Sequence, residues 1–141
     1  RHPELGLNRE FLQEAAMLHD IGITLVDAPG IHCHGTEPYI RHGLMGGKIL
    51  RQEGLPMHAR VAERHTGTGI TREAIEKQGL PLPLADYVPE TLEEQVVCYA
   101  DKFFSKSHPE HEKTFDEALR SLWKFGPECA ATMERWREQF D

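Results

Sequence analysis

The apolar residues of this chain recur every three or four positions in most segments, and this spacing favours helices over any other structure. In residues 8–20, Asn8 is a suitable helix cap, and apolar side chains from Phe11 to Leu18 follow it at helical spacing. The sequence lacks any segment with the sustained alternation of apolar and polar residues that is typical of a strand. It therefore predicts an all-α domain.

Glycines, prolines and capping residues divide the chain into the expected helices. These are residues 8–20, 38–53, 57–65 and 71–78, a helix that begins at Thr91, and a final pair at about 114–125 and 128–140. Thr91 and Glu94 have the spacing of a capping box. Three glycines in the second helix lower its helix propensity and predict that another helix or a ligand approaches closely. Residues 22–38 and 79–89, rich in glycine or proline, are expected to be loops.

The length and charge of the chain limit its organisation and its partners. A length of 141 residues predicts a single domain over residues 1–141. The formal net charge of −7 argues against a nucleic-acid polymer as partner, because phosphate neutralisation needs a basic surface. There is no apolar run of about 18 residues, so no membrane partner is expected. Three widely spaced cysteines do not make a disulfide framework, and a cytoplasmic location is expected.

Histidine is the residue type that points most clearly to a function. Six of the nine histidines fall within residues 19–65, and histidine is a preferred metal ligand that titrates near neutrality. His19 and Asp20 are adjacent at the expected end of a helix, and a carboxylate can bridge two metal ions. The other candidates for the same metal site are His42, His65 and Asp101.

Spacing alone leaves two alternatives open for these residues. They can form a metal site, or the histidines can be hydrogen-bonded core residues while Asp101 pairs with Arg64 or Lys102.

Four short blocks of sequence resemble a known family. They are Ala15-Ala16-Met17-Leu18-His19-Asp20-Ile21-Gly22, Arg41-His42-Gly43, Glu63-Arg64-His65-Thr66-Gly67 and Tyr99-Ala100-Asp101-Lys102. In this order and approximate spacing they resemble the signature of the HD-domain (HDIG-type) metal-dependent phosphohydrolase superfamily, over about residues 8–106. The resemblance implies an HD-domain helical bundle. In that family a further histidine lies on a helix upstream of the His-Asp helix, so we expect that an N-terminal helix is missing before Arg1.

The resemblance also implies a centre with two divalent metal ions, from among Mn, Fe, Co, Ni and Zn. His19, Asp20 and Asp101 would hold the first ion, and Asp20 would bridge to a second ion completed by His42 and His65. Asp20, His42 and His65 would then be the catalytic residues, because a metal-bridging hydroxide would attack phosphorus. The expected substrate is a small phosphorylated metabolite, a nucleotide or a dinucleoside polyphosphate.

Five residues near these blocks are candidates for substrate binding. Arg64 and Lys102 adjoin expected ligands and could contact a phosphate, although solvated helix faces also explain such charges. Thr66 and Gly67 could present backbone N–H groups to an anion, or could simply end a helix. His34 could line the entrance of the site.

Two other functions remain open at this point. Some HD proteins use the same kinds of ligand for a di-iron centre that activates oxygen, and the ligands alone do not separate that oxygenase from a hydrolase. The third alternative is a non-catalytic helical module for binding or signalling, which would not need to retain the candidate ligands.

Overall fold

The structure, a computed structural model, describes residues 2–141 and confirms the all-α prediction. Its α-helices are α1 (Arg9–Leu18), α2 (His42–Gln52), α3 (Pro56–Glu63), α4 (Arg72–Gln78), α5 (Leu92–Asp101), α6 (Phe115–Leu122) and α7 (Pro127–Phe140). Short 3-10 turns connect several of them. Each expected helix has a counterpart within a few residues. None of the helices in residues 2–141 is long and apolar enough to cross a membrane.

Side-chain caps explain why four of the helices begin where they do. The side chains of Asn8, Thr71, Thr91 and Thr114 each accept a hydrogen bond from a backbone N–H of the first helical turn. At α5 the Glu94 side chain also accepts from the backbone N–H of Thr91, which completes the expected capping box. Each cap satisfies a donor that the helix itself leaves free.

The segment 22–38 is more ordered than its sequence suggests. It contains a small antiparallel ladder of β1 (Asp27–Ala28) and β2 (Cys33–His34), flanked by 3-10 turns. A strand of two residues is too short to show an alternating pattern, so the sequence gives no signal for it. A side chain at Gly35 would collide with the backbone of Leu25, so only glycine allows the segment to fold back this closely.

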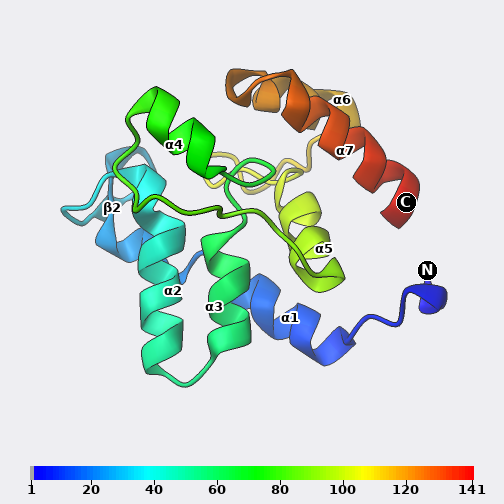
Figure 1. Cartoon of the computed structure of the whole chain (residues 1–141), viewed down its shortest axis with the longest axis horizontal. Coiled ribbons are helices and arrows are strands. Elements are labelled where there is room, and N and C mark those ends of the chain that lie inside the picture. The colour runs from blue at the N-terminus through cyan, green and yellow to red at the C-terminus, as the bar shows by residue number, and fades with distance from the viewer. Residues whose placement is uncertain (1) are drawn as a thin grey trace.

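The glycines of α2 allow the close approach that the sequence predicts. Figure 1 shows α2 and α3 side by side, joined by a short turn. A Cβ atom at Gly43 would lie 2.6 Å from the carbonyl oxygen of Ala62 in α3. A Cβ atom at Gly22 would lie 2.1 Å from the carbonyl oxygen of His42. These contacts draw the end of α1, the start of α2 and the end of α3 to one place.

Helix α5 links two of the three apolar clusters that the described residues form. Its side chain Val97 packs with Ala15 of α1 and Val61 of α3. Its residues Cys98 and Tyr99 pack against α6 and α7 in a larger cluster that includes Met133 and Trp136. In Figure 1, α5 accordingly lies between α1 and α3 on one side and α6 and α7 on the other. The last residue of this central helix is Asp101.

Candidate metal centre

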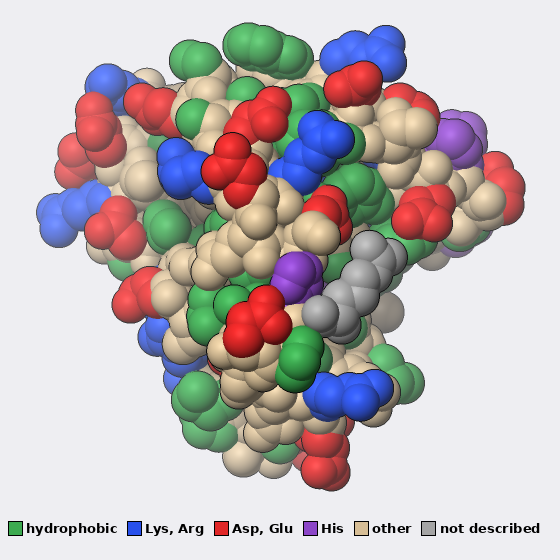
Figure 2. Space-filling view, turned by 90° about the vertical axis from the view of Figure 1, so that its right-hand side faces the viewer, with side chains coloured by type: hydrophobic (Ala, Val, Ile, Leu, Met, Phe, Trp, Pro, Cys, Tyr) green, Lys and Arg blue, Asp and Glu red, His purple; other side chains and the backbone are tan. Residues whose placement is uncertain are grey.

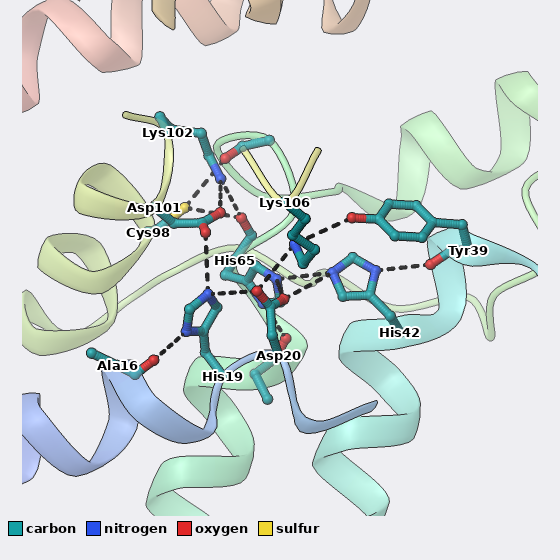
Figure 3. A network of polar contacts seen from close by, with 12 residues as sticks. Ala16, His19, Asp20, Tyr39, His42, His65, Cys98, Asp101, Lys102 and Lys106 are labelled. Atoms are coloured by element: carbon teal, nitrogen blue, oxygen red, sulfur yellow. Dashed lines mark hydrogen bonds and ion pairs between the residues drawn. The ribbon is translucent and has the colours of Figure 1, made fainter. Parts of the chain in front are cut away.

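The structure brings the five predicted metal ligands together, and each stands at or near the end of a helix. His19 and Asp20 directly follow α1, His42 opens α2, His65 comes two residues after α3, and Asp101 ends α5. The expected helix over 57–65 ends earlier, at Glu63, because the backbone leaves the helical conformation at Arg64. Figure 3 shows the five side chains pointing toward one another.

Each of the three histidines is oriented by the same hydrogen bond. The Nδ1 atom of each donates to the backbone carbonyl oxygen three residues earlier: His19 to Ala16 (2.6 Å), His42 to Tyr39 (2.8 Å) and His65 to Ala62 (2.7 Å). A carbonyl oxygen can only accept, so Nδ1 carries a proton in all three rings. The Nε2 atoms are therefore the ones that face the centre, and their direction is fixed by the backbone.

The atoms that meet at the centre are suited to a cation. His42 Nε2 and His65 Nε2 lie 2.9 Å apart, and both side chains are buried. Asp20 Oδ1 lies 3.1 Å from His65 Nε2 and 3.6 Å from His42 Nε2, and within residues 2–141 this buried oxygen receives no hydrogen bond. Lone pairs on two nitrogens and an oxygen repel at such distances, and a divalent ion bound by all three removes the repulsion.

A second group of possible ligand atoms adjoins the first. His19, His65 and Asp101 each offer an atom within 4.8 Å of the others, as do Asp20, His42 and His65. His19 Nε2 lies 3.1 Å from Asp101 Oδ1 and 3.1 Å from Asp20 Oδ2. The two oxygens of Asp20 thus face different histidines, an arrangement compatible with a bridging carboxylate. His65, expected in one group only, has ligand distances compatible with both.

Protonation differs sharply between the histidines of the centre. Burial alone would lower the pKa of His19, but hydrogen bonds to Asp101 and Asp20 raise it to about 10. Burial, together with the nearby His65, lowers the pKa of His42 to about 4. Burial opposes ionisation of Asp20 and Asp101, yet their positively charged neighbours hold both carboxyl pKa values well below the usual range. At neutral pH the centre therefore contains two carboxylates, a neutral His42 and a protonated His19.

Two lysines contact the carboxylates of the centre. Lys102 is buried, and its Nζ donates to the carbonyl oxygen of His65 (2.7 Å) and to Asp101 Oδ2 (2.9 Å). Two of its three ammonium hydrogens are thus engaged with the protein, and Lys102 also lines the cavity beside the centre. Lys106 Nζ lies 3.0 Å from Asp20 Oδ2 and donates to the Tyr39 hydroxyl (3.3 Å).

The other candidate substrate residues are placed in different surroundings. Arg64 does not reach the centre, because its guanidinium donates to the carbonyl oxygens of Asp86 and Val88 and holds the 79–89 loop. His34 is exposed on β2 and is not among the described residues that line the cavity adjoining the centre. Thr66 and Gly67 do line that cavity.

A cavity of about 430 Å³ opens directly onto the centre. His42, His65 and Asp101 form part of its wall. The wall also contains four lysines, Lys102, Lys106, Lys113 and Lys124, and the aromatic residues Tyr39, Phe104 and Phe125. Asp101 is the one carboxylate among the described lining residues, although acidic residues outnumber basic ones by 23 to 16 in the chain.

Sequence reasoning missed Tyr39, Lys106, Lys113 and Lys124. None of them belongs to a recognisable motif, and the three lysines come from the chain after α5 and from the turn after α6. On the molecular face shown in Figure 2, acidic and basic side chains are interspersed, so the gathering of lysines around the cavity contrasts with that face.

A second, mainly apolar cavity of about 640 Å³ lies between α1 and α5. Leu12 and Ala16 line it on one side and Val96 and Ala100 on the other. It reaches His19, Asp20 and Asp101. The centre is therefore approached by one basic cavity and one apolar cavity.

Comparison with known proteins gives one family match and several relatives. The chain is 39% identical over 99 residues to a tRNA (cytidine(56)-2'-O)-methyltransferase of Picrophilus torridus, a match that covers 70% of the chain and 25% of the relative. It is 41% identical over 91 residues to the protein of the same name from Thermoplasma volcanium, covering 64% of the chain and 23% of that protein. It is 45% identical over 94 residues to an uncharacterized protein of Methanocaldococcus jannaschii, covering 65% of the chain and 47% of that protein.

The chain thus spans from about a quarter to about half the length of these relatives. No solved structure matches it significantly. The family model of the HD domain matches residues 2–105, most of the chain, and contains all five clustered residues. Together with the helical fold and the clustered histidines and aspartates, this match shows that the chain belongs to the HD-domain family.

Proposed function

We propose that this chain is a metal-dependent phosphohydrolase that acts on a small phosphorylated metabolite, a nucleotide or a dinucleoside polyphosphate. The observation that carries this proposal is the lysine-lined cavity that opens onto the metal centre. An acidic chain that places four lysines around one cavity creates a local positive field, which favours an anionic substrate.

The clustered residues would accommodate two divalent ions, because they form two adjoining groups of possible ligands. Asp20, His42 and His65 would hold one ion, and His19 and Asp101 would hold the other, with Asp20 shared. Bound ions at such a site supply a nucleophile from water at neutral pH and neutralise charge on the phosphoryl oxygens. The backbone bonds at Nδ1 hold the three imidazoles in the ligand orientation before any ion arrives.

Lys106 is suited to hold a phosphoryl oxygen at the edge of the centre. An ammonium group has three donor hydrogens, and Asp20 and Tyr39 engage two of those on Lys106. The remaining hydrogen is available to a phosphoryl oxygen in the cavity. Lys102 has a different task, because its contacts position Asp101 and the backbone of His65.

The rest of the cavity favours a substrate with a flat apolar group. The rings of Tyr39, Phe104 and Phe125 line it, and all three are partly exposed to solvent. Aromatic rings offer stacking surfaces for a nucleobase. The volume of about 430 Å³ suits a small metabolite better than a polymer.

The proposed function does not include methyl transfer. Two of the relatives are named for methylation of tRNA, but most of each of those proteins lies outside the match. The HD-domain match over residues 2–105 contains the cluster of histidines and aspartates, and this cluster is the basis of our proposal.

The proposal is tested by phosphate release from a panel of phosphorylated metabolites. The purified chain is loaded in turn with Mn, Co, Ni, Zn and Fe, and its metal content is measured alongside activity. Release of phosphate from a nucleotide, or formation of two nucleotides from a dinucleoside polyphosphate, supports a hydrolase if it is abolished in the Asp20→Asn variant and retained in Asp27→Asn. Asp27 is a matched control because its side chain is exposed on β1.

Two results would contradict the proposal. Oxygen consumption by the iron-loaded chain without hydrolysis of any phosphorylated substrate would identify an oxygenase. A chain that binds none of the metals would indicate a non-catalytic helical module.

A further inference from the structure

Two of the four lysines that line the basic cavity have no contact with the carboxylates of the metal centre. Lys102 and Lys106 are engaged by Asp101 and Asp20. Within residues 2–141, Lys113 and Lys124 form no ion pair with a carboxylate. In a chain with 23 acidic residues, two unpaired lysines that face the same cavity indicate a place for an anion that is not part of the protein.

Lys113 is held by the backbone at the mouth of the cavity. Its backbone N–H donates to the carbonyl oxygen of Phe103 (2.7 Å), which ties the loop after α5 to the start of α6. The next residue, Thr114, caps α6. The backbone at Lys113 is thus fixed on both sides, and its half-buried side chain lines the cavity.

Lys124 contacts an aromatic ring that packs on the segment after His65. Its Nζ lies 5.1 Å from the centroid of the Phe125 ring, close enough for a cation–π interaction. The Phe125 ring in turn packs on Gly67, where a Cβ atom would lie 3.5 Å from the ring carbons. Gly67 comes two residues after His65. Lys124 is thus linked through the Phe125 ring to the segment that follows His65.

We propose that Lys113 and Lys124 form a second anion subsite, which binds a phosphoryl group other than the one that is cleaved. This inference rests on the proposed function and narrows its substrate class to molecules with at least two phosphoryl groups. The reacting phosphoryl group lies at the metal centre beside Lys106, and the distal one lies between Lys113 and Lys124. Both distal lysines follow residue 105, where the family match ends, so the subsite belongs to the C-terminal part of this chain.

The test compares substrates with one and with several phosphoryl groups. For the metal-loaded Lys113→Gln/Lys124→Gln variant, the KM for inorganic tripolyphosphate rises by about tenfold or more, because charge-assisted hydrogen bonds are lost. Its kcat stays within about twofold, since the reacting group still meets an intact centre. The KM for p-nitrophenyl phosphate, which has one phosphoryl group, does not change. The Lys113→Arg/Lys124→Arg variant keeps most of the affinity for tripolyphosphate.

A binding measurement tests the subsite without catalysis. In calorimetric titrations of chelator-treated protein, tripolyphosphate binds more tightly to the wild type than to the double glutamine variant. Orthophosphate is the single-group comparison. Lys77→Gln is the matched control for lost charge, because Lys77 is exposed on α4 and pairs only with Glu73 among the described residues.

The outcomes separate this inference from the proposed function. Equal binding of tripolyphosphate by the wild type and the double variant, or equal weakening by Lys77→Gln, would overturn the subsite. A lack of turnover of every phosphorylated substrate would overturn the hydrolase, while the titration would still decide whether the subsite exists.

Discussion

His42 and His65 direct their Nε2 atoms at each other across 2.9 Å in a buried part of the chain. The Nδ1–H group of each ring donates a hydrogen bond to a backbone carbonyl oxygen. The two Nε2 atoms that face each other therefore carry lone pairs. Packing of α2 on α3 enforces this contact. Two apolar side chains would fill this part of the core without bringing two lone pairs together. A cation bound between the two Nε2 atoms is the best explanation for the contact.

Replacing Asp20, the carboxylate that two ions would share, is expected to disrupt the metal centre. We expect the Asp20→Ala variant to lose at least one bound metal ion and to turn over substrate more than about 100-fold more slowly. Even residues that only hold a metal ligand in place contribute about 10–100-fold to metal affinity or activity, and Asp20 would itself be a ligand. Metal content by elemental mass spectrometry and phosphate release measure the two effects. Full metal content in Asp20→Ala would contradict the role of this residue, and Asp27→Ala is the control.

Metal binding is expected to release protons at neutral pH. His19, with a pKa of about 10, carries a proton on Nε2 in the metal-free chain and must lose it to become a ligand. Metal affinity therefore rises with pH across the neutral range. Titration calorimetry in buffers of different ionisation enthalpy counts the protons, and a binding enthalpy independent of buffer would refute this expectation. His108→Gln, a change at an exposed histidine, leaves the proton count unchanged.

We expect Lys102 to act on the metal ligands and not on the substrate. We expect Lys102→Met to weaken metal binding by about 10–100-fold, because Asp101 and the backbone of His65 lose a common partner. At saturating metal the KM for substrate stays unchanged. An increase in KM at saturating metal would instead support direct contact between Lys102 and phosphate. Lys48→Met, at an exposed position of α2, is the control.

A partly buried ion pair between α3 and α5 is expected to make the fold sensitive to acid. Arg60 Nε donates to Glu94 Oε2 at 2.8 Å, and the Glu94 side chain is only 2% exposed. Burial opposes the ionisation of Glu94, but hydrogen bonds from Arg60 and from backbone N–H groups lower its pKa overall. The pair therefore stabilises the fold above the carboxyl pKa of the unfolded chain, near 4.5, and this stability is lost as the pH falls through the lower folded value.

We accordingly expect Glu94→Gln to lower the free energy of unfolding at pH 7 by about 2–4 kcal/mol. The difference in free energy of unfolding between the variant and the wild type becomes smaller as the pH falls below the pKa of Glu94 in the unfolded chain. Denaturant unfolding at several pH values measures it, with Glu112→Gln as an exposed control. A difference that stayed constant down to acidic pH would mean that ionisation of Glu94 does not stabilise the fold.

The contact between α2 and α3 depends on the absence of a side chain at Gly43. Gly43→Ala would place a methyl group 2.6 Å from the carbonyl oxygen of Ala62, and the backbone would have to shift. We expect a loss of about 1–3 kcal/mol in stability, with weaker metal binding because His42 and His65 flank this contact. Thermal unfolding compares it with Gly30→Ala, where an added Cβ meets no atom within 4 Å. Equal melting temperatures would contradict the close approach.

Much of the helical framework could be predicted from the sequence because its signals are local. Asn8, Thr71 and the pair of Thr91 and Glu94 cap helices in the structure as their spacing predicts. The β1–β2 ladder could not be predicted, since two residues carry no period. The predicted ligands lie at or near the ends of these helices. The order of the four motifs along the chain was sufficient to predict the family.

The sequence by itself determined the helices, their caps and the family, because these depend on residues within a few positions of one another. Only the tertiary structure decided where the long charged side chains go. It placed Arg64 on the 79–89 loop, buried Lys102 behind Asp101, and brought Lys113 and Lys124 to the basic cavity. The physical reason is that these flexible side chains take their positions from partners far away in the chain, which meet only when α5, α6 and α7 pack together.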